Sequence, residues 1–316
     1  MTTLLNNASM NAPKKTPRRL LDGVLLLDKP LGLSSNDALM RAKRLFSAKK
    51  AGHTGTLDPL ATGLLPLCFG EATKFSQDLL EADKTYEATL KLGERTTTGD
   101  AEGEVTDRRD VTCTAHDVAA SLDGFRGLIR QVPPMYSALK RDGKPLYEYA
   151  RAGETLEREA REVTIHHLEL IDCALPFATI RVTCSKGTYV RTLGEDIGEA
   201  LGCGAHLTML RRTGVGALTL DGAVTLEQID ASPLESRDAL LAPVDALLST
   251  FKRVDLDAEQ TKRFLHGQKL RVGERVAGAP ERVRVYAHDA RLLGTAQLLE
   301  GVIAPERVIA SSSESA

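Results

Sequence analysis

The 316-residue sequence contains no tryptophan, and aromatic residues make up only 4% of it. A tyrosine or phenylalanine within a polar motif is therefore a strong candidate for a specific role. No apolar stretch approaches the roughly 18 residues that a membrane-spanning helix requires. Residues 1–17 also lack the apolar segment of a secretory signal peptide. We therefore expect a cytoplasmic protein without membrane association, in which residues 1–22 form a disordered leader.

Cysteine is scarce and does not form a recognisable pattern. The five cysteines are odd in number and include no CxxC pair, which is typical of reduced thiols in a cytoplasm. Cys203 and His206 have the spacing of half a zinc site, but no second CxxC or HxxxH pair is present to complete it. Residues 202–204 lack the third glycine and the preceding strand of a dinucleotide fingerprint. The sequence thus predicts neither a metal nor a cofactor.

Neither sign of charge is in excess, since the formal net charge is −2. Basic residues nevertheless cluster in two places. Residues 41–50 contain five Lys or Arg side chains and no acidic residue. Residues 126–161 contain eight Lys or Arg side chains and five acidic residues. Most such runs are solvated faces, although both clusters would also suit contacts with phosphates. The clusters permit a nucleic-acid partner without identifying one.

The hydrophobic pattern mixes strands and helices without strict alternation. We expect strands at residues 23–28, 86–92, 163–173, 178–184, 207–211 and 217–220, and helices at 34–46, 71–83, 116–125 and 190–201. This order is typical of an α+β fold with a mixed, largely antiparallel central sheet flanked by helices.

Three segments define the expected domain organisation. Residues 23–250 form the main domain, and residues 126–161 within it lack apolar periodicity and are expected to form a long, functional insertion. A boundary near residue 250 precedes a small β-rich domain at 251–316, with a helix at 258–266, strands at 282–288 and 292–298, and disordered last residues.

The segment GHTGTLDPLATGLLP (residues 52–66) is the strongest candidate for chemistry. Its carboxylate, Asp58, lies in a loop rich in Gly, Thr and Pro, and catalytic groups are often placed on loops supported by a rigid scaffold. An aspartate before proline also commonly caps a turn. Spacing alone leaves both interpretations open.

This segment resembles the catalytic motif of the TruB family of tRNA pseudouridine synthases. Further motifs of the family follow in order over residues 23 to about 230: LDKP (27–30), GLSSND (32–37), GEATKF (70–75), DKTY (83–86), MYSALK (135–140), CSKGTYVR (184–191), GCGAH (202–206) and LRR (210–212). The resemblance implies the pseudouridine synthase fold. More weakly, the tail from about residue 251 resembles the family's small PUA-type RNA-binding domain.

The resemblance also implies roles for particular residues. Asp58 matches the essential aspartate, Arg191 the arginine that pairs with it, and Tyr86 the tyrosine that stacks on the target base. Substrate-binding positions of the family are matched by His53, Tyr189, Leu210 and Lys29. Taken alone, Leu210 and His53 could equally be core residues, Tyr86 an inward-facing aromatic of a strand, and Arg191 a surface side chain.

The implied reaction isomerises uridine 55 in the T-arm loop of tRNA to pseudouridine, without cofactor or metal. The implied partner is the tRNA T-arm stem-loop, gripped in part by residues 126–161, and we expect a monomer. Two alternatives stay open: the catalytic subunit of a guide-RNA-directed pseudouridine synthase, and a tRNA-folding chaperone in which binding matters more than catalysis. A charged pair of Asp58 with Arg191 would favour an enzyme, since a pure binder does not need one.

Overall fold

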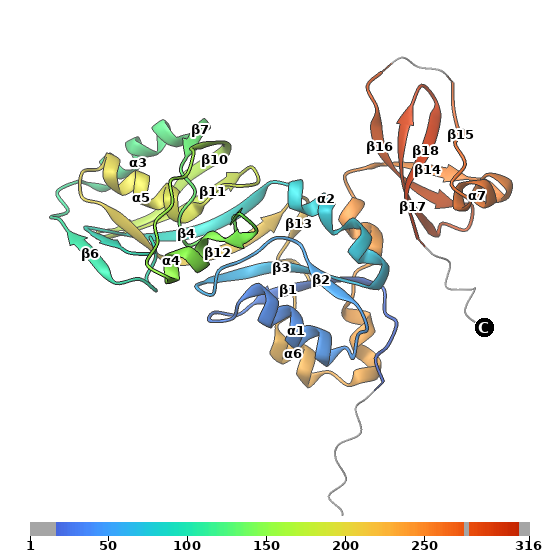
Figure 1. The fold of residues 1–316 in the computed structure, drawn as a ribbon, viewed down its shortest axis with the longest axis horizontal. Helices are drawn as coiled ribbons and strands as arrows, with labels where there is room; N and C mark the ends of the chain where they lie inside the picture. Colours follow the sequence, from blue (N-terminus) through green and yellow to red (C-terminus); the bar gives the residue numbers. More distant parts are fainter. Residues whose placement is uncertain (1–16, 275–277, 310–316) are drawn as a thin grey trace, which may run out of the picture.

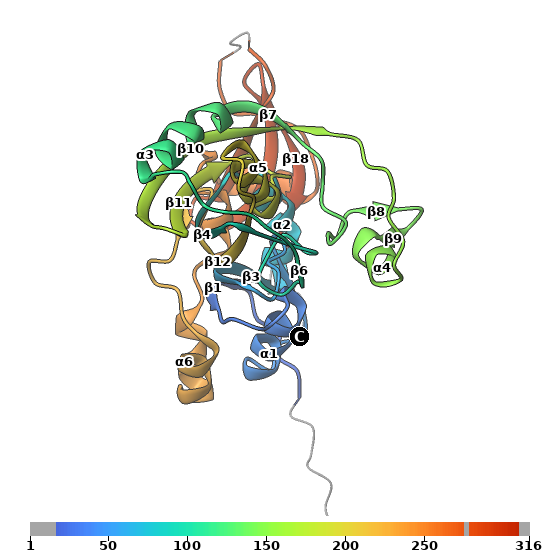
Figure 2. The ribbon, with the colours of Figure 1, turned by 90° about the vertical axis from the view of Figure 1, so that its left-hand side faces the viewer.

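The computed structural model describes residues 17–274 and 278–309 (Figures 1 and 2). Most of the expected leader and the expected disordered last residues lie outside this range. Residues 17–22, which were expected to belong to the leader, are ordered: Arg19 forms a β-bridge with Ala48 and an ion pair with Asp238. Within the described residues, no helix is both long and apolar enough to cross a membrane.

The larger domain is built on one mixed sheet of nine strands in the described residues. Its main path runs β1-β3-β12-β4-β11-β10-β7, with β2 and β13 paired at its sides. Only the β3–β12 pair is parallel. This arrangement confirms the predicted α+β class with a largely antiparallel sheet. The strands are β1 (Gly23–Lys29), β2 (Ala51–His53), β3 (Ala61–Phe69), β4 (Lys84–Leu92), β7 (Gly127–Gln131), β10 (Arg161–Ala174), β11 (Phe177–Cys184), β12 (Ala205–Val215) and β13 (Leu218–Thr219).

Helices pack at both halves of this sheet, where their sequences provide apolar faces. α1 (Ser35–Leu45) is capped by Ser34, whose side chain accepts a hydrogen bond from the Asp37 amide. α1 and α6 (Leu226–Ala231) lie together beside β1 and β2, whereas α3 (Ala115–Ser121) and α5 (Val190–Ala200) lie at the other half (Figure 1). The helices therefore leave the middle of the sheet free for the loops between them.

The structure differs from the predicted elements in several places, and the central strand β3 was not predicted at all. Residues 71–83 form a 3₁₀ helix, Gly70–Phe75, and a short α2, Ser76–Glu81, instead of one helix. β12 is longer than predicted because polar residues interrupt its apolar pattern. The expected insertion also begins later than residue 126, because residues 127–131 form β7, an edge strand of the central sheet. This strand was not predicted, since its mostly exposed side chains do not alternate between apolar and polar. Only residues 132–160 leave the sheet, and they carry β8 (Lys140–Arg141), β9 (Lys144–Pro145) and α4 (Leu146–Arg151).

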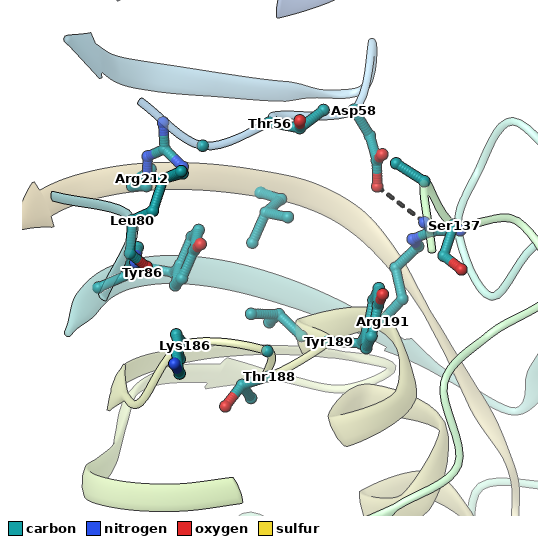
Figure 3. Close-up of a pocket in the computed structure, with 16 residues that line it drawn as sticks. Thr56, Asp58, Leu80, Tyr86, Ser137, Lys186, Thr188, Tyr189, Arg191 and Arg212 are labelled. Carbon is teal, nitrogen blue, oxygen red and sulfur yellow. Dashed lines mark hydrogen bonds and ion pairs between the residues drawn. The ribbon is translucent and has the colours of Figure 1, made fainter. Parts of the chain in front are cut away.

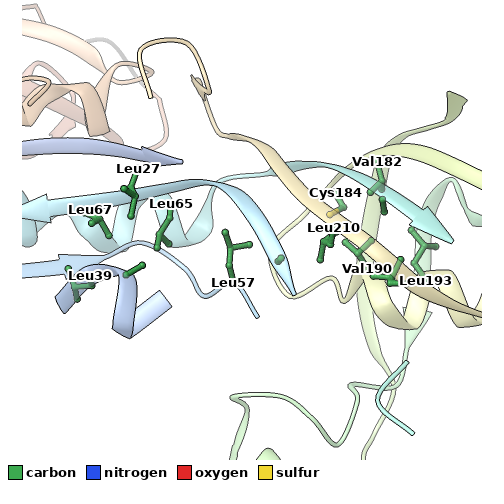
Figure 4. Packing of buried hydrophobic residues seen from close by; sticks show 14 of the residues in the cluster. Leu27, Leu39, Leu57, Leu65, Leu67, Val182, Cys184, Val190, Leu193 and Leu210 are labelled. Carbon is green, nitrogen blue, oxygen red and sulfur yellow. The ribbon is translucent and has the colours of Figure 1, made fainter. Parts of the chain in front are cut away.

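One hydrophobic core runs beneath both halves of the sheet. Leu27, Leu65 and Leu67 fill one half and Val182 and Leu193 the other, all fully buried. Figure 4 shows Leu57 and Leu210 between these two groups, at the middle of the molecule. The core thereby anchors the loop that carries residue 58 and the strand that carries residues 210–212.

A second, smaller sheet begins at β14 (Lys252–Leu256). Its order is β14-β16-β17-β18-β15, and it encloses a core of its own with α7 (Ala258–Leu265). The remaining strands are β15 (Leu270–Arg271), β16 (Glu281–Ala287), β17 (Leu292–Leu299) and β18 (Val302–Val308). This domain lies beside α2, away from the α3–α5 half (Figure 1).

Polar contacts join the two domains at α2. Asp78 on α2, with a side chain only 5% exposed, forms an ion pair with Arg282 of β16. Arg282 also pairs with Glu306 at 2.6 Å. Lys74 donates from Nζ to the Val308 carbonyl at 2.9 Å, and Arg307 donates back to the Lys74 carbonyl. The smaller domain is therefore fixed to the helix that also contributes Leu80 to the cavity described below.

Replacing Arg282 by methionine is expected to lower the free energy of unfolding by roughly 2–3 kcal/mol, because the buried carboxylate of Asp78 loses its nearest cation. Urea unfolding monitored by circular dichroism measures the loss. Arg271→Met is the matched control, since among residues 17–274 and 278–309 Arg271 has a single long, exposed hydrogen bond, to the Glu300 carbonyl in the same domain. Equal stabilities of the two variants would show that the Asp78 ion pair does not hold the domains together.

Candidate active site

Asp58 lies in the loop between β2 and β3, and the core fixes this loop. The neighbouring Leu57 is 3% exposed, and its amide donates to the buried Ser35 side chain at 2.7 Å. The Ser35 hydroxyl returns a hydrogen bond to the Leu57 carbonyl at 3.1 Å. Further hydrogen bonds join Gly32 to Pro59 and Ala61 to Asp58. The backbone that carries Asp58 is thus held on both sides.

Arg191 forms the predicted ion pair with this carboxylate. Its Nη2 lies 2.8 Å from Asp58 Oδ2, at one side of the cavity shown in Figure 3. Arg191 occupies the first turn of α5, and its side chain is 7% exposed, whereas that of Asp58 is 41% exposed. The guanidinium also donates to the Thr98 carbonyl at 3.0 Å and to the Tyr136 carbonyl at 2.6 Å. The arginine is therefore rigid, while the carboxylate stays accessible.

A second acid near this arginine was not found by sequence reasoning. Asp100 is 3% exposed, and its Oδ2 lies 3.6 Å from Arg191 Nε. Its Oδ1 accepts from the Thr98 hydroxyl at 2.5 Å and from the Glu102 amide at 3.1 Å. The sequence showed only a charged turn here, and nothing in the local pattern indicated that this turn packs against α5.

The exposed side of Asp58 faces a cavity of ≈ 300 Å³. Asp58, Arg191, Tyr86, Tyr189 and Leu210, which the sequence placed in the site, all line it. The volume is within the range of about 300–1,000 Å³ that is usual for small-molecule sites. Side chains from β4, α5, β12 and the Asp58 loop thus meet in one place although they are far apart in the sequence.

Tyr86 supplies the aromatic surface of this cavity. It lies on β4 opposite Arg212 of β12, and Figure 3 shows its ring on the side of the cavity away from Arg191. Burial raises the pKa of the Tyr86 hydroxyl above its usual range, and the nearby Arg212 guanidinium opposes that rise. The hydroxyl is therefore protonated at neutral pH. Leu210, 8% exposed, belongs both to the core and to the cavity wall.

His53 lies beside a second cavity of ≈ 480 Å³. Asp58, Arg191 and Ser137 line both cavities, so the ion pair stands in their common wall. His53 Nδ1 lies 3.1 Å from the Gly55 carbonyl, and burial lowers the pKa of the imidazole, which is therefore neutral at pH 7. Residues of the insertion complete this second cavity: Tyr136, Tyr147 and Arg151.

Lys29 lies outside both cavities. Its side chain is fully buried, and Nζ donates to the carbonyls of Pro30 at 2.9 Å and Leu33 at 2.6 Å. Burial lowers the pKa of this lysine to about 8, although the charge of Asp58 opposes the shift. The expected contact of Lys29 with substrate therefore stays a prediction. Lys29 ties together the turn between β1 and α1.

The arrangement places an accessible, ion-paired carboxylate beside an aromatic ring in a partly closed cavity. Such a carboxylate can act as a nucleophile or a base on a bound ring system, while the tyrosine provides a stacking surface. Within residues 17–274 and 278–309, no three His, Cys, Asp or Glu side chains are grouped closely enough to hold a metal ion.

Comparison with protein-family models gives three adjoining matches. Residues 43–190 match the TruB family pseudouridylate synthase N-terminal domain, and residues 191–249 the tRNA pseudouridylate synthase B C-terminal domain. Residues 253–309 match a second C-terminal model, described as pseudouridine synthase II TruB, C-terminal.

Curated relatives cover almost the whole chain. A Burkholderia mallei protein named tRNA pseudouridine synthase B is 72% identical over 94% of this chain and 99% of its own length. Relatives of the same name from Burkholderia lata and Cupriavidus pinatubonensis are 69% and 64% identical, over 98% and 96% of this chain and 96% and 99% of their own lengths.

Solved structures show the same fold at low sequence identity. A chain from a Cbf5-Nop10-Gar1 complex superposes with a TM-score of 0.69 at 24% identity, covering 92% of this chain and 85% of that one. A chain from an H/ACA RNP bound to a substrate RNA containing 2′-deoxyuridine gives a TM-score of 0.71 at 23% identity, with coverages of 93% and 87%.

Proposed function

Because the chain belongs to the TruB family of pseudouridine synthases, we propose that it isomerises uridine 55 in the T-arm loop of tRNA to pseudouridine. The observation that carries the proposal is the 2.8 Å ion pair between Asp58 and Arg191 at the mouth of a cavity lined by Tyr86. The relatives named tRNA pseudouridine synthase B supply the reaction and the RNA class.

The reaction requires a base that has left the RNA stack. It breaks the bond between C1′ and N1, turns the freed uracil and joins its C5 to C1′, so no atom or electron is supplied from outside. The target nucleotide of a folded loop must be flipped outwards to reach an enclosed carboxylate. Asp58 is proposed to act on this nucleotide, while Tyr86, Tyr189 and Leu210 hold the uracil.

In this reaction Arg191 is proposed to stabilise the charged form of the Asp58 carboxylate. The entering base would remove water from the Asp58 carboxylate, and the Arg191 guanidinium at 2.8 Å supplies the opposite charge that a carboxylate away from water requires. The carbonyls of Thr98 and Tyr136 hold Arg191 in position before substrate arrives. Asp58 is therefore kept ready as an anion.

The RNA surface is proposed to surround the two cavities. His53 lies next to the cavity mouth, where it can contact the loop beside the flipped base, and residues 132–160 contribute Tyr136, Tyr147 and Arg151 to the second cavity. Basic side chains of residues 41–50, on α1 and just after it, can contact phosphates. We also propose that the protein acts as a monomer on tRNA in the cytoplasm.

Purified protein should form pseudouridine in an unmodified tRNA transcript with no other macromolecule present. Nucleoside mass spectrometry after digestion measures the product, and a transcript with cytidine at position 55 is the control. Activity only after addition of a guide RNA would favour the guide-dependent alternative. Tight tRNA binding with no product from either transcript would favour the chaperone alternative.

Tyr86→Phe is expected to leave tRNA binding close to wild type, because stacking on the ring, worth about 1–3 kcal/mol, does not need the hydroxyl. If the hydroxyl takes part in proton transfer, the single-turnover rate should fall by roughly 10²-fold. Rapid-quench kinetics and filter binding measure the two quantities. Tyr189→Phe is the matched control in the same cavity. A fully active Tyr86→Phe enzyme would limit Tyr86 to a stacking role.

A further inference from the structure

Two buried cations in the 300 Å³ cavity have no ion-pair partner in the part of the chain that the structure describes. Arg212 is 1% exposed; its Nε donates to the Leu64 carbonyl at 2.8 Å, and its buried Nη2 has no hydrogen-bond partner among the described residues. Lys84 is 8% exposed, and its Nζ donates to the carbonyls of Leu79 at 3.3 Å, Leu80 at 2.7 Å and Ala82 at 2.5 Å. Both side chains are held by neutral oxygens only.

These cations lie on the side of the cavity that faces away from Asp58. Arg212 and Tyr86 are directly opposite each other on β12 and β4, so their side chains share one face of the sheet. Figure 3 shows Arg212 and Tyr86 on one side of the cavity and the Asp58–Arg191 pair on the other. Lys84 precedes Tyr86 by two residues on the same strand and lines the same cavity.

The adjacent Arg211 has an ion-pair partner, so the absence of such a partner within the described segments is particular to the arginine that faces the cavity. Arg211, on the opposite face of β12, donates to both carboxylate oxygens of Asp28, at 3.0 and 2.7 Å. Burying an unpaired charge costs several kcal/mol. An arrangement that pairs Arg211 but leaves Arg212 and Lys84 unpaired suits an anion that is present only during the reaction.

The proposed isomerisation produces such an anion on the uracil. When C1′–N1 breaks, the bonding electron pair stays on N1, while the negative charge of Asp58 is consumed by a new bond to C1′ or by the C2′ proton. If Asp58 instead adds to C6 of the base, the charge moves to O4. By every route the negative charge passes from the carboxylate to the uracil.

We infer that Arg212, together with Lys84, forms a cationic wall that stabilises the negatively charged uracil while it is detached and turned. This inference rests on the proposed pseudouridine synthase activity and extends it. Fixed charges directed at the position where charge develops are among the strongest contributors to catalysis. They also hold the base inside the cavity between bond cleavage and bond formation, because the anion is attracted to the wall.

The test compares two T-arm stem-loops, one with uridine and one with 5-fluorouridine at the target position. Fluorine stabilises the uracil anion by itself, so a substrate carrying it depends less on cations from the protein. Single-turnover consumption of the target nucleoside is followed by mass spectrometry for wild type, Arg212→Met, Arg212→Lys and Lys84→Met. Arg211→Met is the matched control, since it removes a paired arginine from the same strand.

Arg212→Met is expected to react about 10²-fold more slowly than wild type on uridine, but less than about tenfold more slowly on 5-fluorouridine. Arg212→Lys should recover part of the rate, and Lys84→Met should show the same dependence on fluorine as Arg212→Met. Arg211→Met should react at the wild-type rate on both substrates. Thermal melting identifies any variant that fails to fold. If Arg212→Met does not fold, the comparison of the two substrates is made with Lys84→Met instead.

An equal loss on both substrates would mean that Arg212 and Lys84 act only through the structure of the cavity, and the inference would be wrong. A variant within twofold of wild type on uridine would also overturn it. Both results differ from failure of the proposed function, in which the wild-type protein itself would consume no uridine.

Discussion

Asp58→Asn is expected to lose pseudouridine formation entirely while binding tRNA almost as well as wild type. The amide keeps the size of the carboxylate and can stay near Arg191, but it has no negative charge with which to attack carbon or accept a proton. The surrounding loop is fixed by Leu57 and Ser35, so the substitution should not disturb the fold. Single-turnover kinetics and filter binding on the same tRNA measure both properties.

Asp107→Asn is the matched control for this variant. Asp107 has a side chain 40% exposed, close to the 41% of Asp58, and also pairs with an arginine, Arg109, but lies outside both cavities. It should keep wild-type activity. Substantial product from Asp58→Asn would remove Asp58 from the reaction, and loss of tRNA binding would show that the carboxylate mainly shapes the RNA surface.

Arg191→Lys is expected to slow the single-turnover rate by at least about 10²-fold, or roughly 2.7 kcal/mol in the barrier, although the positive charge remains. One ammonium group cannot reproduce the planar set of donors that reaches Asp58 and the carbonyls of Thr98 and Tyr136. The buried Asp100 would also lose its nearest cation.

The control for Arg191→Lys is Arg109→Lys, which alters a partly exposed arginine that pairs with Asp107 and Glu199. Exposed pairs of this kind contribute little, so its rate should match wild type. If Arg191→Lys reacts within twofold of wild type, a general positive charge is sufficient and the directional hydrogen bonds of Arg191 are not needed.

Much of the fold could be predicted because its elements have clear local patterns. The apolar run at β1, the capped helix α1 and the stripe of α5 were all identified from sequence. β7 was missed because an exposed edge strand carries no apolar alternation. The long β12 was predicted too short because polar residues, including Arg212 and Thr213, interrupt its apolar pattern.

The site was predicted mainly through the family motifs, and the structure brings five of the seven predicted residues into one cavity. His53 lies at the adjoining cavity, and Lys29 is fully buried and lines neither cavity. A lysine after a buried strand gives no sign of whether its amine reaches a cavity or turns back to nearby carbonyls.

Asp100, Arg212 and Lys84 were not predicted because their importance depends on contacts between segments far apart in the chain. Asp100 is in an unremarkable charged turn until α5 brings Arg191 next to it. Arg211 and Arg212 are adjacent and identical in the sequence, yet Arg211 pairs with Asp28 and Arg212 lines the cavity. Only the register of β12 against β4 separates their roles.

Mapping pseudouridine at single-nucleotide resolution tests the central claim most directly. One unmodified tRNA transcript is incubated separately with wild-type protein and with Asp58→Asn, and each uridine is then assayed by chemical modification and primer extension. The account predicts full conversion at position 55 alone with wild type and none at any position with Asp58→Asn. Conversion at another position, or equal conversion by the two proteins, would contradict it.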